Sequence, residues 1–153
     1  MEQTITITTD NVTDTEDLGS KIGGALSGGE VIELISDMGG GKTTITRGIV
    51  RGSGSTNNVA SPTFTISKVY QAPGFSIHHY DLYRLSEPGI IMHELQELFG
   101  DRSTVTIVEW PDIAHSLLPS SRITIELTPT SEFQRRITIK GPDEIIKKIK
   151  DNL

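Results

Sequence analysis

The chain has 153 residues, no cysteine and a formal net charge of −6, and this length suits a single domain, residues 1–153, with a sizeable core. The lack of cysteine excludes disulfides and thiolate metal sites. No apolar run approaches the roughly 20 residues that span a bilayer, and the N-terminus has no signal-peptide pattern, so we expect a cytoplasmic protein without a membrane association.

The negative charge is concentrated in the first 120 residues. Residues 121–153 carry seven basic and five acidic side chains and are therefore +2, which leaves −8 for the rest of the chain. An acidic body disfavours extensive contact with the phosphates of a nucleic acid. If RNA is involved, we expect another protein to hold most of it.

Predicted strands and helices alternate through the first half of the chain. In chain order, the pattern predicts a strand at Thr4–Thr8, a helix that starts at a capping box of Thr13 and Glu16 and stops at Gly28-Gly29, a strand at Val31–Ile35, and a helix from Thr43. The first helix places Leu18, Ile22 and Leu26 on one face, which we expect to be buried.

The second half adds a hairpin and further alternating elements. In chain order, these are two hairpin strands at Phe64–Tyr70 and Ser76–Tyr80, a helix from Pro88 to Phe99, a strand at Thr104–Val108, a short helix at Asp112–Leu118, strands at Arg122–Leu127 and Arg136–Lys140, and a helix at Pro142–Lys150. Interleaved strands and helices indicate an α/β fold, and the hairpin makes the sheet mixed rather than wholly parallel.

A glycine-rich loop between the strand at Val31–Ile35 and the helix from Thr43 has the composition of a phosphate-binding loop (P-loop). Its glycines allow successive N–H groups to point at one phosphate group, and the helix N-terminus adds a partial positive charge. Lys42 can reach the β- and γ-phosphates, and the Thr43 hydroxyl can ligate Mg²⁺. The residues expected to bind the nucleotide are Asp37, Met38, Gly39, Gly40, Gly41, Lys42, Thr43 and Thr44.

The loop departs from the usual pattern at its first position, where Ser36 replaces glycine. Serine lacks the freedom of glycine at positive φ, so nucleotide affinity or nucleotide choice could differ. The alternative interpretation is a glycine-rich turn beside an ordinary surface lysine. With the strand before the loop and the helix after it, we predict an α/β, P-loop NTPase-like three-layer fold around a mixed, mostly parallel central sheet.

Three further residues have the chemistry that a nucleotide-hydrolysing site needs. Glu109 ends an apolar strand, at the edge where ligands bind in open α/β sheets, and could hold Mg²⁺ or orient the attacking water. Asp81 directly follows a predicted strand and could face the same ion or water. Thr63 could bind Mg²⁺ or the γ-phosphate, as switch threonines do. We expect catalytic roles for these three and metal ligation by Thr43 and Glu109; the alternatives are a surface glutamate, a structural aspartate and a turn threonine.

The four histidines carry less information. His78 and His79 are adjacent, so on a strand they face opposite sides and do not form an obvious metal pair. His93 and His115 lie among helix-forming residues, and we interpret them as structural.

Four motifs in a fixed order give the chain a specific resemblance. They are Asp-x-Gly-x-Gly-Lys-Thr-Thr at 37–44, Ser-Pro-Thr-Phe at 61–64, His-x-Asp-Leu-Tyr-Arg-Leu at 79–85 and Val-Glu-Trp at 108–110. Over roughly residues 12–140 the chain resembles the TsaE (formerly YjeE) family, P-loop ATPases needed to make threonylcarbamoyladenosine in tRNA.

The resemblance implies a cytoplasmic ATPase of low intrinsic activity that uses ATP and Mg²⁺. It implies two partner proteins, of the TsaB and TsaD type, that form the transferase modifying adenosine 37 of tRNAs reading ANN codons; tRNA would be met only through them. ATP hydrolysis would support turnover of that complex. In this picture Lys42 cradles the phosphates, Thr43 and Glu109 hold Mg²⁺, and Thr63 and Asp81 link the nucleotide state to the partner surface.

Two other function classes stay open. A small-molecule P-loop kinase usually carries an arginine-bearing lid, and the arginines between the loop and Glu109 form no such cluster: Arg47, Arg51, Arg84 and Arg102. A nucleotide-dependent regulator without hydrolysis would not need the carboxylates of Asp81 and Glu109.

Overall fold

The structure is a computed structural model that describes residues 2–36, 41–59, 67–82, 89–109 and 115–153. Its strands are β1 (Glu2–Thr9), β2 (Val31–Ile35), β3 (Ser67–Gln71), β4 (Ser76–Asp81), β5 (Thr104–Glu109), β6 (Ile123–Pro129) and β7 (Arg135–Pro142). Its helices are α1 (Val12–Gly24), α2 (Lys42–Gly52), α3 (Gly89–Phe99), the 3-10 helix η2 (His115–Leu117) and α4 (Asp143–Asn152).

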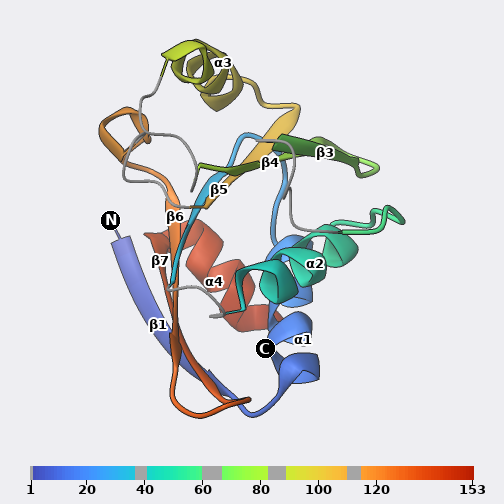
Figure 1. The fold of residues 1–153 in the computed structure, drawn as a ribbon, viewed down its shortest axis with the longest axis vertical. Helices are drawn as coiled ribbons and strands as arrows, with labels where there is room; N and C mark the ends of the chain where they lie inside the picture. The colour runs from blue at the N-terminus through green and yellow to red at the C-terminus, as the bar shows by residue number, and fades with distance from the viewer. Residues whose placement is uncertain (1, 37–40, 60–66, 83–88, 110–114) are drawn as a thin grey trace.

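Within the described residues, the strands form one seven-stranded sheet in the order β1-β7-β6-β2-β5-β4-β3 (Figure 1). The four central strands β6, β2, β5 and β4 are parallel, whereas β3, β7 and β1 pair antiparallel at the two edges. The mixed sheet and the β3–β4 hairpin are therefore confirmed. The parallel centre brings the carboxyl ends of β2, β5 and β4 to the same edge.

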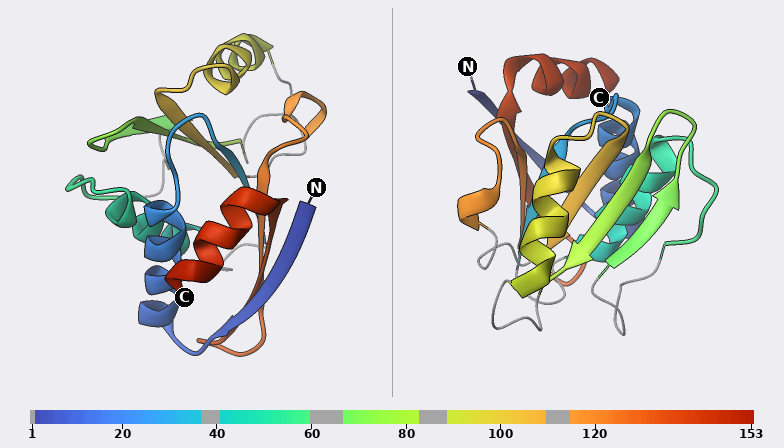
Figure 2. Two further views of the ribbon diagram at one scale, coloured as in Figure 1. Left: turned by 180° about the vertical axis from the view of Figure 1, so that it is seen from behind. Right: turned by 90° about the horizontal axis from the view of Figure 1, so that it is seen from above.

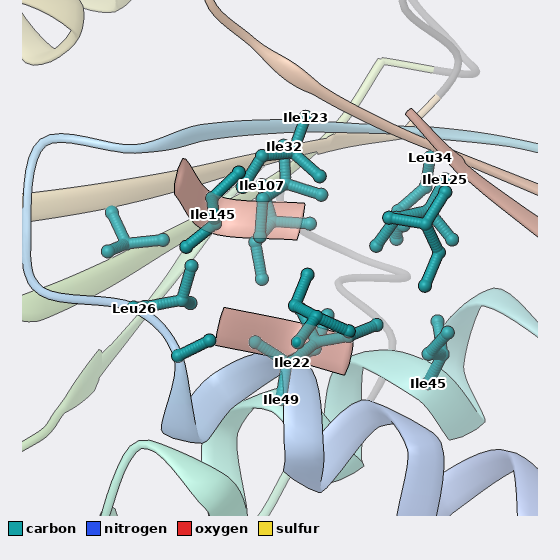
Figure 3. Close-up of a cluster of buried hydrophobic side chains, with 14 of the residues drawn as sticks. Ile22, Leu26, Ile32, Leu34, Ile45, Ile49, Ile107, Ile123, Ile125 and Ile145 are labelled. Atoms are coloured by element: carbon teal, nitrogen blue, oxygen red, sulfur yellow. The ribbon is translucent and has the colours of Figure 1, made fainter. Parts of the chain in front are cut away.

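Helices cover both faces of the sheet (Figure 2). Helices α1, α2 and α4 pack on one face, and α3 covers the other, so the three-layer α/β fold is confirmed. The larger core lies under α1, α2 and α4, where isoleucine side chains of the helices meet those of the central strands (Figure 3). The smaller core lies under α3 and includes Tyr80, Leu95 and Val108. No described helix has the length and apolar character needed to cross a membrane.

Helix α1 begins at a different cap from the one predicted. Asn11 is the N-cap, and its side chain accepts a hydrogen bond from the backbone N–H of Asp14 at 2.8 Å. The predicted cap, Thr13, lies inside the first turn, so the capping box was wrong. The predicted box partner, Glu16, instead accepts a hydrogen bond from Arg51 of α2 at 2.9 Å.

Helices α1 and α2 touch backbone to backbone through glycines. A Cβ atom placed on Gly19 would overlap the carbonyl oxygen of Ile45, and one placed on Gly48 would overlap that of Glu16. Gly23 and Gly52 make the same kind of approach one turn further along. Glycine is required at these positions because any side chain would force the helices apart. We call the contact formed by Gly19, Gly23, Gly48 and Gly52 the glycine seam.

Candidate nucleotide site

The predicted phosphate-binding loop joins the carboxyl end of β2 to the N-terminus of α2. Gly41 has φ 99°, a conformation that favours glycine, and stands at the N-cap position without a side chain to cap the helix. Helix α2 starts at Lys42, one residue earlier than predicted. The first-turn N–H groups of α2 and the positive end of its dipole therefore lie next to the loop, as an anion site requires.

Lys42 lies across the loop. Its side chain is buried, and its Nζ donates a hydrogen bond to the carbonyl oxygen of Ser36 at 3.1 Å. The contact uses the backbone of Ser36, so serine in place of the usual glycine is compatible with it. Thr43 and Thr44 are partly exposed in the first turn of α2. The predicted loop residues Asp37, Met38, Gly39 and Gly40 lie outside the described residues.

Glu109 and Asp81 are brought together by the sheet register. Glu109 of β5 pairs with Leu34 of β2 on one side and with Asp81 of β4 on the other. Residues paired in this way project to the same face, and Leu34 is part of the core under α2. Both carboxylate-bearing residues therefore lie on the face of α2, at the end of the sheet where β2 enters the loop. Thr63 lies outside the described residues.

The Glu109 carboxylate has an unusual environment. The residue is 2% exposed, and its Oε1 makes no hydrogen bond to the described residues. The buried carboxylate of Glu33 differs, because its Oε1 accepts hydrogen bonds from Arg122 Nε at 2.7 Å and Thr124 Oγ1 at 2.6 Å. Glu33 is thus held by the fold through its Oε1, although its Oε2, like Oε1 of Glu109, makes no hydrogen bond to the described residues. An unpaired buried carboxylate oxygen is costly, so Oε1 of Glu109 is available for another ligand.

The residues present fit Mg²⁺ held together with phosphates. The described residues contain no group of three or more His, Cys, Asp or Glu side chains that could hold a metal ion by itself. Mg²⁺ at nucleotide sites is bound by one or two protein oxygens, phosphates and water, so one carboxylate and one hydroxyl suffice. Glu109, whose Oε1 is without a hydrogen bond in the described part of the chain, and Thr43, at the start of α2, have the required chemistry.

His79 is a site residue that the sequence analysis missed. Its side chain is fully buried on β4, with Nε2 3.5 Å from Oε1 of Glu109, and neither ring nitrogen makes a hydrogen bond to the described residues. The signal was available: His79 is two residues before Asp81, so a strand puts both on one face. The prediction that His78 and His79 face opposite sides is consistent with this placement, because Glu94 of α3, on the other face of the sheet, is one of the carboxylates that act to raise the pKa of His78.

Arg135 is the second missed residue. A Cβ atom on Gly41 would lie 3.8 Å from Nε of Arg135, which starts β7. The guanidinium Nη1 donates hydrogen bonds to the backbone carbonyls of Ser131, Glu132 and Gln134 at 3.1, 3.2 and 2.9 Å. Arg135 is therefore held at the loop by the β6–β7 turn. The sequence argument considered only arginines between the loop and Glu109, and of these Arg51 binds Glu16 on α1 instead of forming a lid.

Comparison with known proteins decides the family. The family model described as threonylcarbamoyl adenosine biosynthesis protein TsaE matches residues 9–137. The chain belongs to the TsaE family. It is similar to proteins named tRNA threonylcarbamoyladenosine biosynthesis protein TsaE from several bacteria. The one from Bacillus subtilis is 37% identical over 110 residues, which cover 72% of this chain and 68% of that protein. The one from Rickettsia felis is 32% identical over 133 residues, covering 84% and 75%.

A third TsaE relative, from Haemophilus influenzae, is 36% identical over 102 residues, and the match spans 63% of this chain and 61% of that protein. Among solved structures, the crystal structure of Bacillus subtilis YdiB superposes with a TM-score of 0.79 at 26% identity, covering 99% of this chain and 95% of that one. This likeness confirms the P-loop NTPase-like fold. The TsaE family takes part in the biosynthesis of threonylcarbamoyladenosine in tRNA, and the recognition of the family from its four motifs is confirmed.

Proposed function

We propose that the chain, as a single domain of residues 1–153, binds and hydrolyses ATP with Mg²⁺. In this role it supports the cytoplasmic machinery that forms N6-threonylcarbamoyladenosine at position 37 of tRNAs reading ANN codons. The observation that carries the proposal is the buried Glu109 carboxylate on the strand next to the one that enters the loop, with an oxygen that makes no hydrogen bond to the described residues. Hydrolysis needs a carboxylate in that place to hold Mg²⁺ or to orient the attacking water. Binding of a nucleotide without hydrolysis does not need one.

The predicted site residues then have the following proposed roles. The first-turn N–H groups of α2 and the Lys42 ammonium bind the phosphates, and Lys42 exchanges the Ser36 carbonyl for a phosphate oxygen. Glu109 and Thr43 would hold Mg²⁺, which neutralises charge that develops on the phosphates. Asp81, one strand further from the loop, is placed to orient water or to pass the nucleotide state to a partner. Thr63 is proposed to bind Mg²⁺ or the γ-phosphate and to pass the nucleotide state to the partner. Asp37, Met38, Gly39, Gly40, Gly41 and Thr44 complete the phosphate cradle.

The partners are proposed on the family resemblance. They are the two proteins of the threonylcarbamoyl transferase, of the TsaB and TsaD type, and they hold the tRNA. A body of net negative charge suits binding to proteins rather than direct binding to a polyanion. In the described part of the chain no arginine cluster forms a lid over the loop, so we expect slow hydrolysis by the isolated chain, with a group from a partner supplying charge stabilisation.

The test measures ATP hydrolysis and complex formation together. We expect slow turnover by the chain alone, a changed rate with the transferase pair, and earlier elution of the complex on sizing chromatography in ATP than in ADP. The matched control is Lys42→Ala, which should weaken binding of Mg²⁺-ATP by about 1.5–3 kcal/mol in a calorimetric titration without changing the fold. Identical elution with ATP, with ADP and without nucleotide, together with no change in rate, would favour a small-molecule kinase. Unchanged affinity of Lys42→Ala for Mg²⁺-ATP would contradict the assignment of the nucleotide site itself.

A further inference from the structure

A buried carboxylate lies on β2, shortly before the first position of the phosphate-binding loop at Ser36. Glu33 is an ionisable residue that is only 2% exposed. Its neighbours Ile32 and Leu34 belong to the larger core, so the alternation of side chains along the strand turns Glu33 towards the side of the sheet that α3 covers. Burial of a charged group costs free energy unless partners compensate it, so the groups that contact Glu33 determine its role.

The groups around Glu33 come from β6 and from the connection that leads to it from β5. We call the described part of this connection, from His115 to Arg122, the crossover. Oε1 of Glu33 accepts hydrogen bonds from Arg122 Nε at 2.7 Å and from Thr124 Oγ1 at 2.6 Å. Arg122 Nη1 also donates to the carbonyl of Pro119 at 3.2 Å, and Nδ1 of His115 lies 3.7 Å from Oε2 of Glu33. One carboxylate therefore lies against both ends of the crossover.

The crossover is bonded to itself as well as to Glu33. The N–H of Leu118 donates to the carbonyl of His115, and the N–H of Arg122 donates to the carbonyl of Pro119, each at 3.2 Å. These two closed turns make the crossover compact, so its ends do not move independently. Loss of the Glu33 carboxylate would therefore release the crossover as a whole rather than a single side chain.

The crossover shares a core with the end of β5. Leu118 is 7% exposed and belongs to the smaller core together with Val108. Val108 immediately precedes Glu109 on β5, and it pairs in register with Glu33 of β2. Because close-packed interiors transmit displacements, the position of the crossover bears on the position of the strand end that carries Glu109.

We propose that Glu33 is a positioning residue for hydrolysis: it anchors the crossover, which in turn fixes the end of β5 that carries Glu109. The inference rests on the proposed function, in which the Glu109 carboxylate must meet Mg²⁺ or water at a defined place. A misplacement of about 1 Å can lower the rate of an enzymatic reaction about 100-fold. Glu33 projects from the face of β2 opposite to the one that packs against α2, so we expect binding of the nucleotide phosphates to be independent of it.

The test replaces the carboxylate by an apolar side chain. Glu33→Leu is expected to fold, since apolar residues often replace a buried ion pair without loss of stability, and the Arg122 side chain, 25% exposed, can then reach water. With partners present, we expect its turnover rate to fall about tenfold while the dissociation constant for Mg²⁺-ATP stays within about twofold. In the chain alone, the amides of Leu118 and Arg122 should exchange with deuterium faster than in the unmutated chain. Glu33→Gln keeps an oxygen that accepts from Arg122 and Thr124, so it should restore most of the rate.

Two further variants complete the test. Arg122→Gln removes the guanidinium that links Glu33 to the crossover, so it should also slow turnover without weakening nucleotide binding, and its rate decides the matter if Glu33→Leu does not fold. The matched control is Glu126→Leu, which removes an exposed carboxylate two residues after Thr124 on the same face of β6. It should change neither turnover nor amide exchange.

Each other result has a definite meaning. Faster amide exchange in Glu33→Leu with an unchanged turnover rate overturns the positioning role, because the crossover would then be anchored without effect on Glu109. Unchanged exchange overturns the anchor itself, and a parallel loss of ATP affinity overturns the positioning role by assigning Glu33 to the fold of the whole site. If the unmutated chain neither binds nor hydrolyses ATP with its partners, the proposed function fails and the positioning role fails with it, whereas amide exchange still shows whether Glu33 anchors the crossover. Thermal unfolding shows that the compared proteins are folded.

Discussion

His79 and Glu109 lie beside each other on neighbouring parallel strands, with the imidazole Nε2 3.5 Å from the carboxylate Oε1. Both side chains are buried, and the separation is about half an ångström longer than a hydrogen bond. A small adjustment would let Nε2–H donate to one lone pair of Oε1, which would fix the orientation of the carboxylate while the other lone pair of that oxygen faces a ligand. Groups that orient a metal-binding carboxylate in this way tune both metal affinity and activity.

We therefore expect His79→Gln, which keeps a side-chain N–H donor, to hydrolyse ATP nearly as well as the unmutated chain in the presence of partners. His79→Ala should lower the turnover rate about tenfold and raise the Mg²⁺ concentration for half-maximal rate, with little change in the KM for ATP. Steady-state rates over a magnesium series measure both effects. The control is His78→Ala, the neighbour on the opposite face, which should leave the magnesium dependence alone. Equal losses in both alanine variants would assign His79 to folding only.

Glu109→Gln should reduce hydrolysis far more than nucleotide binding. The amide keeps the shape of the side chain but cannot stabilise Mg²⁺ or orient water as a carboxylate does. Single-turnover hydrolysis with partners, set against calorimetric binding of ATP, separates the two effects. A parallel fall in both would make Glu109 a binding or structural residue, and no fall in either would move the catalytic role to Asp81, its register partner on β4.

The glycine seam predicts a contrast between two glycine-to-alanine changes in the same helix pair. Gly48→Ala should lower the free energy of unfolding by about 2–3 kcal/mol, because the new Cβ meets the Glu16 carbonyl oxygen and the helices cannot separate without losing their core contacts. Gly24→Ala, where the nearest atom to the new Cβ is 3.7 Å away, should be neutral or stabilising by up to about 1 kcal/mol. Urea unfolding of both variants checks this. Similar losses in the two would mean that helix propensity, not the close approach, governs the effect.

Stability should fall between about pH 7 and pH 5 because of His78. Burial lowers the pKa of His78 below its ordinary value, and the nearby carboxylates of Glu94 and Asp101 offset this only in part. In the unfolded chain the pKa returns to about 6.5. The unfolded state therefore binds more protons in this window, so the free energy of unfolding decreases as pH falls towards the folded-state pKa.

Urea unfolding at pH 7.5 and pH 5.5 measures the effect, and His78→Gln should show a smaller loss between the two values than the unmutated chain. Asp101 does not affect this comparison, since hydrogen bonds from Ser103 lower its pKa from an ordinary value near 4. Its contribution to the free energy of unfolding is therefore lost only at more acidic pH. Parallel pH dependence in the two proteins would contradict the assignment to His78.

The elements that the sequence predicted well are those with one strong local pattern. β2 was predicted to the residue, because a continuous apolar run ends abruptly at a glycine loop, and Glu109 was placed correctly at the end of β5. The cap of α1 was missed because Asn11 and Thr13 are both good capping residues, and only the backbone conformation decides between them. Arg135 was missed because the order of strands across the sheet, which brings β6 beside β2, is a long-range property that local pattern does not contain.

The glycine seam has a mechanical consequence for the proposed response to the nucleotide state. Helix α2 carries the N-terminus that is expected to face the phosphates, and the seam joins it to α1, so the two helices form one rigid unit. Because the close approach prevents one helix from sliding along the other, such a movement cannot readily signal the loss of a phosphate. The responsive side of the site is then the opposite one, at the carboxyl ends of β4 and β5. There Asp81 and Glu109 are register partners on neighbouring strands, and we expect a partner protein bound at that edge to respond first to the change.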